Sequence, residues 1–93
     1  MNKGYTNIYN AIFHDNKLSW KAKGIYAQLC SLPDSDSWDY SQKGLQTLAS
    51  DGRKSLEAGL RELKQFGYLD IIQVRKADGR ISYEYIIKND IPP

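Results

Sequence analysis

The stretch LQTLASDGRKSLEAGLRELKQFGYL, residues 45–69, decides the fold. It is typical of two helices joined by a tight turn at Asp51-Gly52, the second helix ending at Gly67. Apolar residues recur at spacings of three and four, which places each set on one helical face: Leu45, Leu48 and Ala49, then Leu56, Leu60 and Leu63. Two short helices across a glycine-containing turn are typical of the helix-turn-helix, whose second helix enters a DNA groove.

Upstream of this stretch, Ser19 has the position of an N-cap for a helix over residues 20–31, which Pro33 ends. We expect one face of that helix to pack on the later helices: Ala22, Ile25, Tyr26, Leu29 and Cys30. Ser41 then caps the next helix, with Tyr40 spaced as a hydrophobic staple to Leu45.

The intervening loop carries three aspartates and a very short predicted strand at Trp38. It lacks the glycine turn and terminal glutamate of a calcium loop, so no metal site is expected. His14 has no partner ligands at metal-binding spacing and is expected at a surface or helix end. Tryptophans and tyrosines in apolar patterns are expected in the core rather than as base-stacking groups: Trp20, Trp38, Tyr26, Tyr83 and Tyr85.

Downstream, residues 68–75 and 81–88 are rich in strand formers and flank Asp78-Gly79, which predicts a hairpin with a two-residue type I′ turn. That turn pairs Val74 with Tyr83 and Ile72 with Tyr85. The predicted core face then collects Ile72, Val74, Ile81, Tyr83, Tyr85 and Ile87. Leu69 and Ile71 fall on the opposite face, so the base of the hairpin is expected to twist or bulge to bury them.

The resulting prediction is an α+β winged helix-turn-helix with three helices and a C-terminal β-hairpin wing. Short strands are expected near Trp38 and at residues 5–9, and one helical turn at residues 10–15. Residues 1–18 form an N-terminal extension, 19–88 the DNA-binding domain, and 89–93 the start of a linker or tail. Periodicity, caps and turn chemistry agree on this order of elements.

Composition narrows the class of protein. The chain has 93 residues, a net charge of +2 and a single cysteine, Cys30, which fits a small buried hydrophobe and a reducing cytoplasm. No apolar run is long enough to span a membrane, and no signal sequence is expected at the start. Basic and acidic residues balance over 1–52, five of each, whereas 53–88 carries eight basic against five acidic residues. The basic excess therefore begins with the second helix of the helix-turn-helix.

Four segments resemble a known family: LSWKAKGIYAQLCSLPD, then W-x-x-S, SDGRKSLEAGLRELKQFGYL and VRKADGR. Together they resemble the winged-helix N-terminal domain of Firmicutes replication proteins, which include DnaD-like primosome components, phage replisome organisers and plasmid replication initiators. The resemblance covers residues 5–88. Its L-S-x-K-A-K-G-x-Y pattern is fairly specific, whereas the L-x-x-L-x-x-x-G-Y-L ending is shared by many winged-helix regulators. It implies DNA binding in replication initiation, with a further domain beyond a linker in the family.

Three groups of side chains are predicted to contact DNA. The second helix of the helix-turn-helix contributes Arg53, Lys54, Ser55, Ala58 and Arg61 from its first turns. The wing contributes Arg75, Lys76 and Arg80. The first helix of the motif contributes Ser41, Gln42 and Lys43. Cations gain affinity by releasing condensed counterions, and arginine or lysine reads guanine O6 and N7. In the alternative interpretation these charges do not contact DNA. Glu57 and Arg61 then form a solvent-exposed ion pair, and the charges of the wing prevent its edge strands from pairing with another chain.

The expected function is double-stranded DNA binding in replication initiation, with major-groove insertion of the helix and backbone or minor-groove contacts from the wing. A transcriptional regulator is the first alternative. The second is a protein-interaction module that self-assembles and binds DNA weakly. Expected partners are duplex DNA, a second copy in a homodimer or higher oligomer, and replication proteins, but no membrane. No nucleophile with a base, phosphate loop or paired carboxylates indicates an enzyme, and no cofactor is expected.

Overall fold

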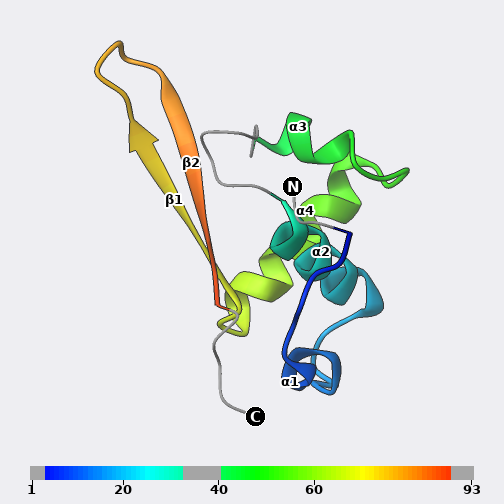
Figure 1. The fold of residues 1–93 in the computed structure, drawn as a ribbon. Helices are drawn as coiled ribbons and strands as arrows, with labels where there is room; N and C mark the ends of the chain where they lie inside the picture. Colours follow the sequence, from blue (N-terminus) through cyan, green and yellow to red (C-terminus); the bar gives the residue numbers. More distant parts are fainter. Residues whose placement is uncertain (1–3, 33–40, 89–93) are drawn as a thin grey trace.

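The computed structural model describes residues 4–32 and 41–88, which form an α+β fold of four helices and one two-stranded antiparallel sheet (Figure 1). The elements follow one another as α1 (Asn10–Phe13), α2 (Trp20–Ser31), α3 (Gln42–Gln46), α4 (Arg53–Gln65), β1 (Leu69–Arg75) and β2 (Ile81–Ile87). The α+β class is therefore as expected. The count of three helices was wrong, because the single turn α1 adds a fourth.

Local hydrogen-bonding chemistry sets the helix ends. The Ser19 side chain accepts a hydrogen bond from the Ala22 N–H at the start of α2, and Ser41 does the same for Gly44 at the start of α3. At the end of α4, Gly67 has a positive φ of 83°, and Tyr68 N–H donates to the Leu63 carbonyl at 2.8 Å. This is a Schellman ending, which only a residue tolerant of left-handed backbone geometry makes without strain.

Helix α3 is shorter than the periodicity indicates. It ends at Gln46, and Leu48 and Ala49 lie in the turn that leads to α4. The Thr47 hydroxyl donates to the Gly44 carbonyl, which satisfies a terminal acceptor of the short helix. The spacing still predicts the buried side correctly, because Leu45 is buried and Leu48 packs against the core.

The hairpin register was predicted wrongly by one residue. The strands pair Ile71 with Tyr85 and Gln73 with Tyr83, and the loop is closed by Lys76 N–H donating to the Arg80 carbonyl at 2.7 Å. The loop therefore has three residues rather than two. A type I′ turn needs positive φ at Asp78 as well as Gly79, but only Gly79 has it, at 88°.

Compared with the prediction, this register exchanges the two faces of β1 and keeps those of β2. Leu69 is buried, and Ile71, Tyr85 and Ile87 pack against the helical core without any bulge at the base. Ile72, expected in the core, lies on the other face and is exposed. Of the residues predicted for the core face, only Tyr85 and Ile87, near the end of β2, therefore pack against the helices.

The core lies between α2 and α4 and is closed by the base of the hairpin. Its buried members are Ile12, Leu18, Ala22, Tyr26, Leu29, Leu32, Leu45, Leu56, Leu60, Leu63 and Leu69. The hairpin extends away from this core, so its outer half stands clear of the helices (Figure 1). Cys30 is half-buried against the core, and burial raises the pKa of its thiol. This agrees with the expected apolar role.

Two aromatic side chains, Trp20 and Tyr83, correct the expected core. Trp20 is 88% exposed because it lies two residues before Ala22, on the opposite side of α2. Tyr83 is 43% exposed on the outer part of the hairpin. Tyr26 is buried as expected, and its hydroxyl donates to the Lys88 carbonyl. Trp38, the aspartate loop and the Tyr40 staple lie outside the described residues.

The N-terminal segment forms no strand at residues 5–9, so that expectation was wrong. It leads directly into α1, whose Ile12 is buried in the core. His14 is the exposed C-cap residue of α1, as expected of a helix-end residue.

Two polar contacts join distant parts of the chain. Glu62 of α4 accepts from both the backbone N–H and the hydroxyl of Ser19, each at 2.8 Å, which fixes the start of α2 on α4. Tyr68 donates to Asp15 at 2.8 Å and so ties the base of the hairpin to the turn after α1. The orientation of α4 and of the hairpin therefore depends on these two carboxylates.

Both carboxylates predict acid-sensitive stability. Hydrogen bonds from Lys17 and Tyr68 lower the pKa of Asp15 from 3.8 to about 2, and those from Ser19 lower the pKa of Glu62 below 4.5. Groups with depressed folded-state pKa values stabilise fully above their unfolded-state values and lose that effect as pH falls through the folded-state ones. We expect the free energy of unfolding to decline from about pH 4.5 towards 2.

Urea denaturation at several pH values checks this. The double variant Asp15→Asn/Glu62→Gln should be less stable at neutral pH and should show a shallower decline over the acid range. Asp70→Asn, which alters an exposed ion pair with Lys88, is the control and should keep the steep decline. An unchanged acid profile in the double variant would contradict this assignment.

Candidate nucleic-acid interface

Helix α4 has one buried and one solvent-facing side. Leu56, Leu60 and Leu63 are buried, whereas Lys54 and Arg61 are exposed and Ala58 is half-buried. The residues predicted to contact DNA therefore occupy the free side of the helix.

The first turn of α4 arranges its polar groups in pairs. Arg53 Nε lies 3.3 Å from Glu57 Oε1, and the Ser55 hydroxyl donates to Asp51 Oδ2 at 2.8 Å. Glu57 thus pairs with the residue four positions before it, not with Arg61 as the alternative interpretation expected. The carboxylate of Asp51 is an anion beside the start of α4, so Ser55 is engaged by that carboxylate rather than by a free phosphate position.

The tip of the hairpin gathers the three predicted wing cations on two faces. Lys76 and Arg80 are cross-strand neighbours, and Arg75 lies opposite Ile81 on the other face. All three side chains are exposed. Asp78 holds Arg80 twice, accepting from its backbone N–H at 3.0 Å and from its Nε at 2.7 Å. Those hydrogen bonds lower the pKa of Asp78.

The start of α3 contributes a weaker set. Gln42 and Lys43 are exposed, whereas the Ser41 hydroxyl is used to cap the helix. As the cap, this hydroxyl accepts a hydrogen bond from a backbone N–H group that would otherwise be available to a phosphate. Of the three, Lys43 has the charge that favours contact with a polyanion.

Sequence analysis missed an exposed apolar and aromatic stripe beside the wing cations. Tyr83 lies across from Gln73, and Ile81 lies across from Arg75, on the same face of the hairpin. Both side chains remain more than two-fifths exposed. The alternation of residues 81–87 signals one buried face, but the sequence does not show that the hairpin outruns the helices it would pack against.

A second exposed aromatic group lies on α2. Lys23 Nζ is 5.3 Å from the centre of the Trp20 ring and also donates to the Phe13 carbonyl at 3.0 Å. This contact joins α1 to the start of α2 through a single amine. It lies on a different element from the cations of α4 and the hairpin.

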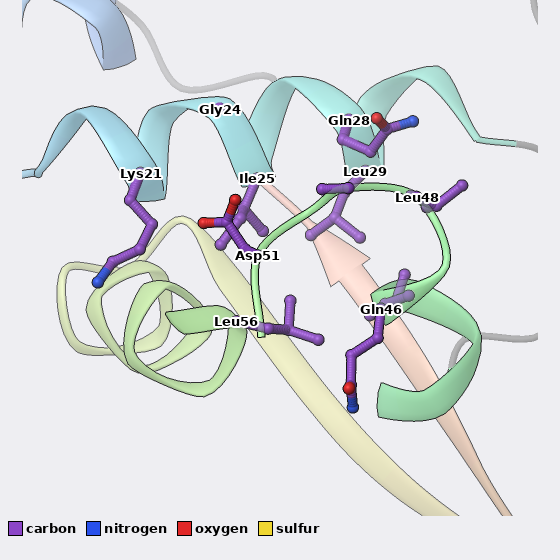
Figure 2. A pocket seen from close by; sticks show the side chains of 11 residues that line it. Lys21, Gly24, Ile25, Gln28, Leu29, Gln46, Leu48, Asp51 and Leu56 are labelled. Carbon is purple, nitrogen blue, oxygen red and sulfur yellow. The ribbon is translucent and has the colours of Figure 1, made fainter. Parts of the chain in front are cut away.

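A cavity of about 330 Å³ lies between α2 and the turn from α3 to α4 (Figure 2). Ile25, Leu29, Leu48 and Leu56 supply its apolar lining, and polar side chains of Lys21, Gln28, Gln46 and Asp51 surround it. Leu56 also belongs to α4, so the cavity borders the inner side of the cationic helix. Its lining combines apolar side chains with a few polar groups, as is common in binding sites for small molecules.

Comparisons with protein-family models, with curated proteins and with solved structures found no match to this chain. Among the described residues, no three or more histidine, cysteine, aspartate or glutamate side chains gather as a metal site would need. No helix in the described ranges is long and apolar enough to cross a membrane.

Proposed function

We propose that this chain is a winged-helix module that binds double-stranded DNA through α4 and the β1–β2 hairpin. The observation that carries the proposal is the pairing of a cationic, solvent-facing first turn of α4 with a hairpin whose projecting tip is basic. In such modules the helix enters the major groove and the wing contacts the backbone or the minor groove. Helices α3 and α4 then form the helix-turn-helix.

Three features support this assignment. The free side of α4 carries Lys54 and Arg61, and the tip carries Arg75, Lys76 and Arg80. The Tyr68–Asp15 hydrogen bond holds the base of the hairpin against the helical body, which favours simultaneous contact by helix and tip. The exposed Tyr83 provides a ring that packs against sugar or backbone alongside these cations.

The resemblance of LSWKAKGIY and the segments after it to Firmicutes replication proteins favours a role in replication initiation over transcriptional regulation. A binding site within an origin, rather than within a promoter, separates these two roles. That DNA is the partner rests on the cations of α4 and the hairpin, and the replication role rests on the resemblance.

Self-assembly is the second candidate, because exposed apolar side chains occur on the hairpin face opposite the core. Ile72 and Ile86 are each 43% exposed and are diagonal neighbours across the two strands. A surface of this kind suits contact with a second copy of the chain. Under this alternative the cations keep the hairpin edge soluble, and duplex affinity is weak.

Fluorescence anisotropy of the chain with a labelled 20-base-pair duplex at several salt concentrations tests the proposal. A chain that contacts about four or five phosphates gives a slope of about −4 when the logarithm of the binding constant is plotted against the logarithm of the salt concentration. Affinity should then fall on the order of 100-fold between about 50 and 200 mM salt. Absence of binding at low salt, together with concentration-dependent dimerisation in sedimentation, would replace the proposal with self-assembly.

A further inference from the structure

Two arginines on the proposed DNA-binding surface are held in the same way. Arg53 Nε pairs with Glu57 at 3.3 Å, and Arg80 Nε pairs with Asp78 at 2.7 Å. In each case the carboxylate engages the inner nitrogen of the guanidinium. The guanidinium is a planar, rigid fork, so holding Nε also restricts the orientation of its second edge, which Nη1 and Nη2 form.

Such a fork has a particular complement in DNA. Guanine presents two acceptors, N7 and O6, side by side on the major-groove edge, and a guanidinium fork donates to both at once. An adenine at the same place presents only one acceptor and a donor, so it is bound less well. Restricting the side chain beforehand lowers the entropy lost on binding, since a free arginine surrenders much rotamer freedom.

Arg53, rather than Arg80, is in the place where base edges are read. It is the first residue of α4, with its side chain 67% exposed, and the first turns of a recognition helix contact base edges. Arg80 lies at the hairpin tip, where backbone or minor-groove contacts are expected. Asp51 beside the same turn repels a phosphate, which leaves base edges as the better partner there.

We infer that Glu57 positions Arg53 as a guanine-reading side chain, so that the Arg53–Glu57 pair determines preference for G·C over A·T base pairs. This inference rests on the proposed DNA binding by α4. Glu57 is a positioning residue, since its carboxylate acts through the arginine. Its charge opposes duplex binding in general, and the positioning favours guanine in particular. The charge of Glu57 therefore alters the affinity for both duplexes, whereas its positioning of Arg53 alters the preference for G·C over A·T.

The test compares dissociation constants for two 20-base-pair duplexes, one of alternating G and C and one of alternating A and T, at one salt concentration. The alternating G·C duplex offers a guanine at every base pair, so the unknown target register does not matter. One bidentate contact contributes about 1–3 kcal/mol of discrimination, which is a preference on the order of tenfold or more for the wild-type chain.

Glu57→Gln should lower this preference severalfold while its affinity for the A·T duplex stays equal or rises, because one negative charge is lost. Arg53→Lys should abolish the preference, since an ammonium is a point charge without a fork. Asp70→Asn is the matched control, because it removes the same charge from another exposed ion pair, Asp70–Lys88. It should change both affinities by the same factor.

The outcomes are distinguishable. A wild-type chain that binds both duplexes equally, or a Glu57→Gln variant with an unchanged G·C preference, overturns the inference while leaving duplex binding intact. A parallel rise in both affinities for Glu57→Gln, matching Asp70→Asn, also overturns it, because Glu57 then acts by charge alone. Failure of the wild-type chain to bind either duplex at low salt overturns the proposed function itself. Circular dichroism confirms that each variant is folded.

Discussion

Arg53→Ala combined with Lys54→Ala is expected to lower affinity for duplex DNA on the order of 100-fold at moderate salt. A lost bidentate base contact costs about 1–3 kcal/mol, and a lost phosphate contact adds a salt-dependent term that reduces the salt slope by about 1. The two residues open α4, and their neighbour Leu56 is already buried. The variant therefore removes the two cationic side chains at the start of α4 and leaves the core unchanged.

Stability should change little in this variant, because Arg53–Glu57 is an exposed ion pair and such pairs contribute about 0–1 kcal/mol. The matched control is Lys17→Ala/Lys64→Ala, which removes the same two charges near the far end of α4. Lys64 lies in its last turn, and Lys17 Nζ is 6.0 Å from the Phe66 ring. If the control loses as much affinity as the variant, net charge rather than a located interface governs binding.

Gly59→Leu is expected to lower the free energy of unfolding by about 2–3 kcal/mol. Gly59 is buried on α4 where that helix crosses α2, and a Cβ built on it overlaps the Cδ1 of Ile25. The Lys21 Cγ atom lies 3.5 Å away and the Ile25 Cγ1 atom 3.6 Å away, so a leucine side chain fits only if the Ile25 side chain or α2 moves. The better helix propensity of leucine offsets about 1 kcal/mol of this cost.

Gly24→Ala is the matched control for this prediction. Gly24 is an exposed glycine within α2, and no atom lies within 4 Å of a Cβ built on it. Alanine there should raise the free energy of unfolding by about 0.5–1 kcal/mol, through helix propensity and a less flexible unfolded chain. Urea denaturation of both variants measures the difference. Equal stability of Gly59→Leu and the wild type would show that α2 and α4 are not closely packed at this point.

The two predictions are linked through α4. Its buried side holds the helix on α2 through Gly59 and through the Glu62–Ser19 hydrogen bonds, and its free side carries the cations. A variant of the buried side that moves the helix should also weaken duplex binding, because the position of Arg53 relative to the hairpin tip changes. A variant of the free side has no such effect on folding.

Helix ends were predictable from sequence because they depend on hydrogen bonds between near neighbours. Ser19 and Ser41 cap α2 and α3 as expected, and Gly67 ends α4 with a positive φ. A serine hydroxyl or a glycine acts on backbone groups within three or four residues, whatever the rest of the chain does. The cations of α4 are exposed for the related reason that the opposite face of the helix is apolar.

The cation pairing was less predictable. Spacing alone allows Glu57 to pair with Arg61 or with Arg53, because both lie four residues away. The structure selects Arg53, whose Nε lies 3.3 Å from Glu57 Oε1. The hydrogen bonds of Ser55 and Ser41 likewise show that two of the predicted contact residues already serve the helix ends.

The sequence by itself determined where α2, α3 and α4 begin, where α2 and α4 end, that a hairpin turns near Asp78-Gly79, and that basic charge collects after residue 52. The tertiary structure alone decided the hairpin register, because Asp78-Gly79 suits either a two-residue or a three-residue loop. Burial of Leu69 in the helical core favours the three-residue loop, and a shift of one residue in register exchanges the two faces of a strand. Likewise, Ser19 and Glu62 are 43 positions apart in the sequence, so no local pattern predicts their contact, and only the packing of α2 on α4 brings them together.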